Sequence, residues 1–423
     1  MIRTEASAAA AQPARPAQVG LFALTFACAG LPLYIHLPAF AAAELGLPLA
    51  TVGTILIAIR ILDFLQDPAL GWVTDRWHRR RGALAALALL LLGGGIAGVF
   101  ALPPDPAAGP VVPRLVLALV MVFTGYSLGS ILFYGESARL AGSGSAAAQY
   151  RLAAWREGGA LAGVILAAAA PALLAAVAGG SGYAAFGWTV AALAAVTLAT
   201  TGALWRQPGL PERRFRIGDL AGSGAGWLVG LALVNTLPVA LTSTLFLFFV
   251  EDRLRLPGLA GPFLILFFLA AGLSVPGWSA LARRFGARRV LAGAMLMSVL
   301  AFAGTALLPP GAALPFALIC LASGATVGAD MVILPALFAT RLAAAGVQAG
   351  TAFGIWSFAG KLALALAAAI ALPMLDRAGF VPGGANDPGA LRALTFGYAI
   401  LPCLLKAATV ALILTLPRRL FAG

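Results

Sequence analysis

The sequence predicts an all-α membrane protein with twelve transmembrane helices, arranged as two six-helix halves. Of its 423 residues 61% are hydrophobic and only 10% are charged, and its mean hydropathy is +0.97. Soluble domains carry about 25% charged residues. Twelve apolar segments long enough to span a bilayer follow one another, six on each side of a polar stretch. Because the bilayer core requires every backbone polar group to be paired within the protein, we expect these segments to be helices.

The first six segments lie near residues 19–42, 51–73, 83–103, 114–138, 152–177 and 183–205. Six more lie near residues 226–250, 259–281, 290–308, 313–338, 350–374 and 393–416. The predicted organisation is therefore a cytoplasmic tail (1–18), an N-terminal bundle (19–205), a cytoplasmic linker loop (206–225), a C-terminal bundle (226–416) and a second cytoplasmic tail (417–423).

The two halves resemble each other in sequence. Gly71-Trp72 ends the second segment and leads into a run of arginines, and Gly277-Trp278 does the same for the eighth segment, 206 residues later. Two pairs of glycines, each spaced by four, also occupy related places in the fourth and tenth segments: Gly125 and Gly129, Gly324 and Gly328. We expect these glycines to allow close helix packing. Internal repeats with a binding site at their interface are typical of transporters.

Positive charge predicts the orientation. If both termini are cytoplasmic, the tails and loops on that side carry 19 of the 28 Lys and Arg residues, and the opposite loops carry five. The net charge of +13 is then a topology signal that faces anionic lipid, and no nucleic acid is needed to explain it. We expect a multi-pass protein of the bacterial inner membrane.

Charges inside the second segment are the main functional signal. Asp63 and Asp67 lie in this apolar run, and Arg60 precedes them by about one turn. The spacing places all three on one helix face. Two carboxylates at i and i+4 can converge on one small cation or share one proton. The alternative is a structural ion pair with Arg60 and Lys361.

Six further ionisable groups lie within or at the ends of predicted spans. Arg156 and Glu157 are adjacent, so they point about 100° apart and only one is expected to face a given cavity squarely. Arg156 would hold an anionic or hydroxylated substrate, or pair with an acid of the second or fourth segment. Glu136 is equally suited to an interfacial and to a functional role. Asp330 is a weak candidate for lining a polar cavity. We assign no role to Lys406. Lys361 and Lys406 are the only lysines in the chain.

Several classes of function are disfavoured. No nucleophile with a base and an orienting group is visible, so we do not expect an enzyme. The three cysteines are far apart and apolar in context, which predicts no metal or cofactor site apart from Na⁺ at the aspartates. No filter motif indicates a channel. We expect a monomeric carrier whose partners are a small-molecule substrate and membrane lipid.

The loop after the second segment carries a first resemblance. The run from Gly71 to Arg80, GWVTDRWHRR, resembles the signature of the major facilitator superfamily. In that superfamily this loop latches the cytoplasmic side, so the resemblance implies a gating role for Gly71, Asp75 and Arg76. Asp75 is suited to cap the N-terminus of a neighbouring helix and to pair with Arg.

A more specific resemblance lies just upstream. RILDFLQDPALGWVTDR is similar to the glycoside–pentoside–hexuronide:cation symporter family, which includes the sodium:galactoside symporters. The resemblance implies that Asp63 and Asp67 bind the coupling cation, with help from Ser127. It also implies that Arg156 lies at the sugar pocket and that Lys361 lies near the cation site.

Departures from the family pattern fall on the cargo contacts. Ala27 and Ser130 stand where the symporters have acids, and Tyr134 replaces a pocket tryptophan. The cation residues are kept, so we expect a Na⁺- or H⁺-coupled symporter of a small solute, sugar-like or more amphiphilic. Its expected cargo contacts are Arg156, Tyr134, Ser130 and Glu157. The alternatives are an uncoupled carrier or lipid flippase of the same fold, and a membrane binding or assembly factor that transports nothing.

Overall fold

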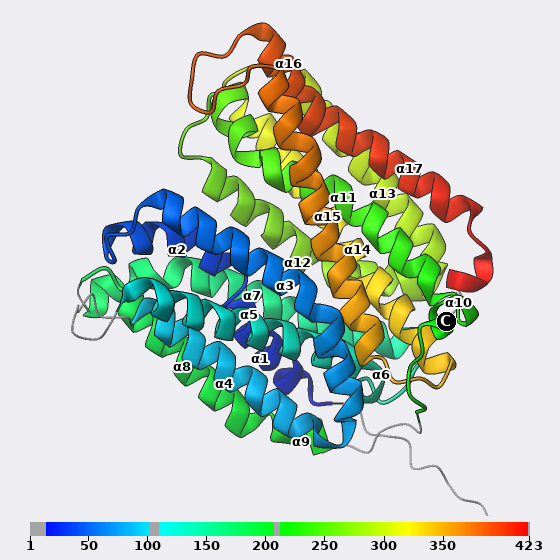
Figure 1. Cartoon of the computed structure of the whole chain (residues 1–423). Coiled ribbons are helices and arrows are strands. Elements are labelled where there is room, and N and C mark those ends of the chain that lie inside the picture. Colours follow the sequence, from blue (N-terminus) through cyan, green and yellow to red (C-terminus); the bar gives the residue numbers. More distant parts are fainter. Residues whose placement is uncertain (1–13, 102–109, 179, 207–211, 422–423) are drawn as a thin grey trace, which may run out of the picture.

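The N-terminal half is a bundle of long helices in the computed structural model (Figure 1), which describes residues 14–101, 110–178, 180–206 and 212–421. Its helices are α1 (Pro16–Ala27), α2 (Leu31–Ala43), α3 (Leu49–Arg76), α4 (Arg81–Phe100), α5 (Val111–Gly135), α6 (Ser137–Leu140), α7 (Ala146–Ala178), α8 (Tyr183–Thr200) and α9 (Gly202–Arg206). Residues of the predicted N-terminal tail before Ala14 lie outside the described part.

The C-terminal half is a second bundle. Its helices are α10 (Gly218–Gly222), α11 (Ala225–Phe248), α12 (Ala260–Phe285), α13 (Ala287–Ala303), α14 (Ala313–Ala344), α15 (Gly350–Arg377), α16 (Pro388–Thr395) and α17 (Leu401–Thr415). Single turns of π-helix (Phe249–Arg253 and Phe396–Ile400) extend α11 and join α16 to α17.

The predicted twelve-span architecture is confirmed. Ten helices of the described residues are long and apolar enough to cross a membrane by length and composition. The spanning-length helix α3 adds an eleventh crossing and carries Arg60, Asp63 and Asp67. The short helices α1 and α2 follow one another and together supply the twelfth.

The first span is broken, where the sequence predicted one continuous segment from 19 to 42. Helix α1 ends at Ala27 and α2 begins at Leu31. Gly30 precedes α2 in a non-helical conformation (φ −72°, ψ −111°), and Pro32 lies in the first turn of α2. Because Pro32 has no amide N–H to donate to the preceding turn, it interrupts a continuous helix but fits the first turn of a new one.

The last span also differs from its predicted range of 393–416, since it starts at Pro388 and contains a π-helical turn. Pro402 cannot donate a hydrogen bond to the carbonyl four residues earlier. The amide of Leu401 instead bonds to the carbonyl of Phe396, five residues back. The proline therefore accounts for the change of helix type at this place.

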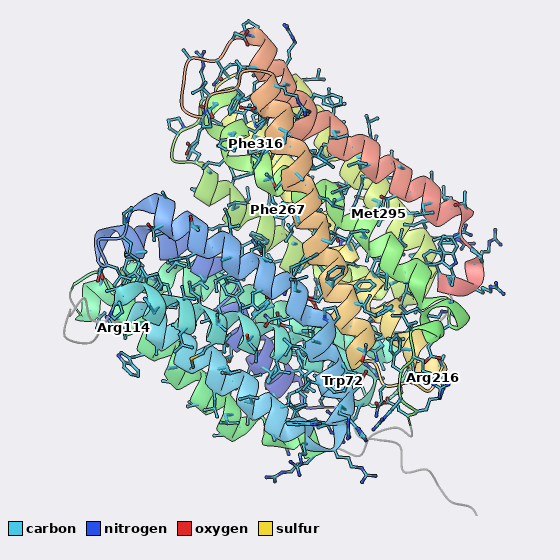
Figure 2. All side chains as sticks on the ribbon, viewed as in Figure 1. Trp72, Arg114, Arg216, Phe267, Met295 and Phe316 are labelled. Carbon is cyan, nitrogen blue, oxygen red and sulfur yellow. The ribbon has the colours of Figure 1, made fainter. Side chains whose placement is uncertain are left out.

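The two bundles meet at one end of the molecule and their ribbons separate toward α2 and α16 (Figure 1). We call the meeting end, which carries α10 and the first turn of α15, the linker end. Trp72 and Arg216 lie there, and Arg114 lies at the opposite end of the N-terminal bundle (Figure 2). The linker is fastened to the C-terminal bundle because the amide of Arg213 donates to the Gly346 carbonyl (2.9 Å) and the amide of Gln348 donates to the Arg213 carbonyl (2.9 Å).

Paired glycines allow close helix packing, as predicted. A Cβ on Gly125 of α5 would lie 2.7 Å from the Leu92 amide nitrogen of α4, and one on Gly328 of α14 would lie 2.5 Å from the Ala271 carbonyl oxygen of α12. Both distances are shorter than real Cβ contacts, so only glycine fits. These contacts fix α4 against α5 and α12 against α14 in equivalent places of the two bundles.

Candidate functional site

Four predicted residues come together where the N-terminal bundle faces α15. The Lys361 ammonium donates to Asp63 Oδ1 (2.7 Å), to Asp67 Oδ1 (2.9 Å) and to Ser127 Oγ (2.9 Å). Ser127 in turn donates to Asp63 Oδ1 (2.9 Å). The side chains of Asp63 and Asp67 are 4% and 0% exposed, so the cluster is almost completely shielded from solvent and lipid. We refer to Asp63, Asp67, Ser127 and Lys361 as the Lys361 cluster.

Local helix geometry explains how these residues meet. Asp63 and Asp67 are four residues apart on α3, so their side chains lie on one face. Helix α3 runs antiparallel to α15 along this face. Asp75, at the end of α3, contacts Gly350 at the start of α15, and Phe64, earlier in α3, stacks on Phe358, later in α15 (ring centroids 4.3 Å apart). Lys361 therefore lies opposite the aspartates.

Two polar residues extend the Lys361 cluster, and the sequence analysis did not assign them a role. Gln66 donates to Asp63 Oδ1 (3.5 Å), and Thr124 of α5 donates to the Gln66 carbonyl oxygen Oε1 (3.0 Å). The signal for Thr124 is its place three residues before Ser127 on the same helix. These contacts orient Gln66, so its amide helps to hold Asp63 in position.

The charge count of the Lys361 cluster favours a cation. Two carboxylates face one ammonium group, so the cluster carries one uncompensated negative charge when both acids are ionised. Nearby like charges resist joint ionisation in a buried place. One proton or one monovalent metal ion would restore neutrality, and several oxygen ligands are already grouped there.

A cavity of about 220 Å³ lies between the bundles. Tyr134 and Glu157 line it from the N-terminal half, and Asn235, Asp330 and Trp356 line it from the C-terminal half. The remaining lining is mainly apolar: Ala232, Val239, Val327, Met331, Leu334, Pro335 and Gly360, with the hydroxyl of Thr236. A mostly apolar cavity with a few polar groups on opposite walls is typical of a small-molecule site.

Arg156 forms one compact group with Glu157 and Tyr134, the two residues that line the cavity from the N-terminal half. Arg156 Nε donates to Glu157 Oε1 (2.9 Å), the Tyr134 hydroxyl donates to the same oxygen (3.3 Å), and the guanidinium stacks over the Tyr134 ring at 3.8 Å. Of the two alternatives for Arg156, pairing with an acid of the second or fourth segment is therefore wrong, because its partner is Glu157. Adjacent residues can pair because the long Arg side chain curls toward its neighbour across their angular separation.

Two further predicted residues of this region are Ser130 and Arg60. Ser130 forms a side-chain hydrogen bond with Tyr126, four residues earlier on α5. Arg60 lies on an exposed part of α3, whereas Asp63 and Asp67 are buried. Their proposed roles in cargo binding and charge pairing stay predictions.

The predicted gating residues lie where α3 ends against α15. Asp75 accepts hydrogen bonds from the amides of Gly350 and Thr351 (both 2.8 Å) and from the Thr351 hydroxyl (2.5 Å). It thereby caps the N-terminus of α15, as its position suggested. A Cβ on Gly71 would lie 2.6 Å from the Gly350 carbonyl oxygen, so the backbones of α3 and α15 touch here. Arg76 is exposed beside this contact.

A second buried ionic group lies in the C-terminal bundle, and the sequence analysis did not find it. Lys406 of α17 donates to Asp330 Oδ2 of α14 (2.5 Å) and to Asn235 Oδ1 of α11 (2.7 Å). We refer to these three residues as the Lys406 cluster. The available signal was that the chain has only two lysines, both in apolar segments.

Comparisons with known proteins agree on the architecture. The sequence profile of the family described as "MFS/sugar transport protein" matches residues 18–418. No curated protein matches the sequence significantly. A bacterial homologue of the iron transporter ferroportin, solved in an outward-facing state, is similar over 94% of this chain and 99% of its own (TM-score 0.69, 18% identity).

Two sugar symporters are similar at a comparable level. The fucose:proton symporter of E. coli has a TM-score of 0.64 and 14% identity, over 93% of this chain and 98% of its own. The proton:xylose symporter has a TM-score of 0.65 and 14% identity, over 93% of this chain and 95% of its own. At such identities the likeness shows a shared fold, and the cargo of each symporter is a property of that symporter alone.

Proposed function

Because the chain belongs to the MFS/sugar transport protein family, and is thus a multi-pass membrane protein of the major facilitator fold, we propose that it is a cation-coupled secondary transporter. The coupling ion is Na⁺ or H⁺, and the cargo is a small solute that enters the 220 Å³ cavity. The observation that carries this proposal is the Lys361 cluster, in which one lysine holds two carboxylates of the opposite bundle.

The Lys361 cluster supports coupling because a cation and Lys361 compete for the same oxygens. Lys361 belongs to the C-terminal bundle, and both aspartates belong to the N-terminal bundle. A bound cation neutralises one negative charge, which weakens the attraction for the lysine. Cation binding therefore loosens a contact between the two bundles.

The loosened contact is part of a longer one. Helices α3 and α15 touch from the Lys361 cluster to the Asp75 cap at the linker end. The loss of the lysine bridge leaves the cap and the glycine contact to hold this end closed. In an alternating-access cycle the linker end must open, so the cation favours the state in which α3 and α15 separate. A coupling free energy of about 1–3 kcal/mol between cation and cargo is enough.

The proposed orientation of the protein in the membrane follows from the distribution of its positive charges. With the linker end and both termini in the cytoplasm, the conformation described here is closed toward the cell interior. The protein works in the inner membrane as a monomer, with lipid around its apolar surface. Its cargo is sugar-like or more amphiphilic, since the cavity combines a few polar groups with a mainly apolar lining.

Cation-dependent thermal unfolding of the purified protein tests the coupling site. Tm is measured in NaCl and in choline chloride at equal ionic strength, and over a pH series. We expect one of the two ions, Na⁺ or H⁺, to change Tm in the parent protein. Asp63→Asn combined with Asp67→Asn removes both carboxylates, so the response is expected to vanish.

Asp376→Asn is the matched control, because Asp376 is an exposed carboxylate on α15 far along the helix from Lys361. A cation response that survives in the double variant places the coupling ion elsewhere. A parent protein that responds to neither ion, yet carries solutes, indicates an uncoupled carrier or a lipid flippase. Stable co-purification with a partner and no solute flux indicates a binding or assembly factor.

A further inference from the structure

The Lys406 cluster lies at the boundary of two cavities. Asp330 and Asn235 line the 220 Å³ cavity between the bundles. Lys406 lines a smaller cavity of about 50 Å³ inside the C-terminal bundle, together with Thr242, Ser298 and Cys403. The Lys406 side chain is 6% exposed and that of Asp330 is 10% exposed. The pair therefore forms a polar wall of the larger cavity, with the lysine behind the carboxylate.

Two buried polar atoms have unused hydrogen-bonding capacity, one on a residue that lines the cavity and one on a residue that contacts its lining. Asp330 Oδ1 is buried and accepts no hydrogen bond from the described residues. Arg156 contacts two lining residues of the opposite wall, Glu157 and Tyr134, and its Nη2 atom is buried and donates no hydrogen bond within the same set. An unsatisfied buried polar group is costly, so such groups usually have a partner in one state of the protein. Here the free acceptor belongs to a residue that lines the cavity, and the free donor belongs to a residue packed against the opposite wall.

The charges around this cavity balance on each wall separately. Glu157 is paired with Arg156 on the N-terminal wall, and Asp330 is paired with Lys406 on the C-terminal wall. Each wall thus has no net charge, unlike the Lys361 cluster with its two acids and one base. A solute with a net charge would find no free counter-charge on either wall, and an unpaired charge in a shielded place is strongly disfavoured.

We propose that Lys406, Asp330 and Asn235 form the C-terminal half of the cargo site, which admits solutes that carry hydrogen-bonding groups but no net charge. Asp330 accepts a hydrogen bond from the solute, and Lys406 balances the charge of this carboxylate. Tyr134 and Glu157 face the solute from the other wall, and Arg156 balances the charge of Glu157. The inference names the cargo class of the transporter proposed above and so rests on that function, but its test requires no transport.

The test measures how the cavity discriminates between charged probes. Cys28, Cys320 and Cys403 are replaced by Ala, and Thr236, which lines the cavity, is replaced by Cys. The single thiol is then labelled with three methanethiosulfonates: the neutral methyl reagent, the cationic trimethylammonium-ethyl reagent and the anionic sulfonatoethyl reagent. Mass spectrometry measures the labelling rate of each reagent. Each labelling rate is divided by the rate at which the same reagent reacts with free 2-mercaptoethanol. We expect the corrected cation and anion rates of the parent to agree within about threefold, since a balanced wall adds no net field.

Single charge changes are expected to shift the ratio of the two rates in opposite directions. Asp330→Asn leaves the wall positive and should favour the anionic reagent by about tenfold, and Lys406→Met should favour the cationic reagent by about tenfold. The double variant Asp330→Asn/Lys406→Met should return to the parent ratio. Asn235→Asp adds a carboxylate and keeps both Asp330 and Lys406. It should therefore favour the cationic reagent, as Lys406→Met does. It tests the proposal even if the loss of a single charge prevents folding.

Two exposed residues of the C-terminal bundle supply the control variants, Asp376→Asn and Arg392→Met, which should leave the ratio unchanged. The proposal is overturned if the neutral reagent fails to label Thr236→Cys, or if the parent strongly prefers one sign of charge. It is also overturned if the variants lower Tm but leave the ratio unchanged, because the pair is then only structural. Failure of the coupling proposal would instead show in the Na⁺ and pH series.

Discussion

The chain has two lysines, and both are buried in ionic clusters, but the two clusters connect different parts of the molecule. Lys361 crosses from α15 to α3 and α5 and thus joins the two bundles. Lys406 joins α17 to α14 and α11 inside the C-terminal bundle. Lys361 faces two carboxylates, and Lys406 faces one.

This difference separates a contact that can switch from one that is fixed. Breaking the Lys361 bridge frees the bundles to move apart, and the second carboxylate leaves room for a cation. Breaking the Lys406 bridge separates helices of one packed bundle and leaves a lone charge. The repeat supports the distinction, because the positions 206 residues after Asp63 and Asp67 are Leu269 and Leu273. We infer that coupling belongs to one half only.

The largest expected effect is at the Lys406 cluster. Asp330→Asn removes the one carboxylate that faces Lys406 among the described residues. It should lower the free energy of unfolding by about 3–5 kcal/mol, as for other buried pairs that lose one partner. Asp330→Asn/Lys406→Met should recover most of this loss. Denaturant unfolding in detergent measures both. Equal destabilisation by the single and double variants would show that the pair itself contributes little.

The contact between α3 and α15 should be sensitive to a single methyl group. A Cβ on Gly350 would lie 2.7 Å from Asp75 Oδ1, so Gly350→Ala pushes the two helices apart at the linker end. We expect a loss of about 1–3 kcal/mol from overpacking, and greater access of a thiol reagent to Thr74→Cys. Gly360→Ala is the control on the same helix, since a Cβ there meets nothing within 4 Å. Unchanged access would show that α3 and α15 do not form the closure.

Loss of one acid should affect the Lys361 cluster less than the Lys406 cluster. In Asp63→Asn the lysine keeps Asp67 as a partner, so the expected loss of stability is about 1–2 kcal/mol. The Lys361 cluster then no longer carries a net negative charge, so the response of Tm to Na⁺ or H⁺ should be lost. A loss of stability as large as that of Asp330→Asn would contradict the assignment of a shared, switchable site.

Removal of the helix cap should have the smallest effect. Asp75→Ala leaves the amides of Gly350 and Thr351 without their acceptor and should lower stability by about 1 kcal/mol. The Lys406 cluster should not change, because it lies within the C-terminal bundle. Hydrogen exchange of the first turn of α15 measures the effect, and unchanged protection there would show that the cap does not hold the closed end.

The fold was largely predictable from hydropathy because a spanning helix requires a long apolar run. The interruptions were less predictable. Both irregularities lie next to a proline, which cannot donate a backbone hydrogen bond. The helix breaks before Leu31 but continues through a π-helical turn before Leu401, and tertiary packing decides between these two outcomes.

The site was predictable where a local pattern or a resemblance existed. The spacing of Asp63 and Asp67 indicated a shared face, and the resemblance implied that Ser127 and Lys361 lie nearby. The pairing of Lys406 with Asp330 depends on the rotation of α14, α11 and α17 about their own axes, which a single sequence does not specify. For the same reason the sequence did not indicate that Arg156 pairs with Glu157.

The two lysines also allow the most direct test of the central claim, that a cation competes with Lys361. Protein labelled with ¹⁵N at the lysine Nζ has only two ammonium signals, assigned with Lys361→Arg and Lys406→Arg. During a titration with Na⁺, or with acid if H⁺ is the ion, we expect the Lys361 signal to move and the Lys406 signal to stay. A Lys361 signal that is unaffected by either ion, or equal shifts of both signals, would contradict the account.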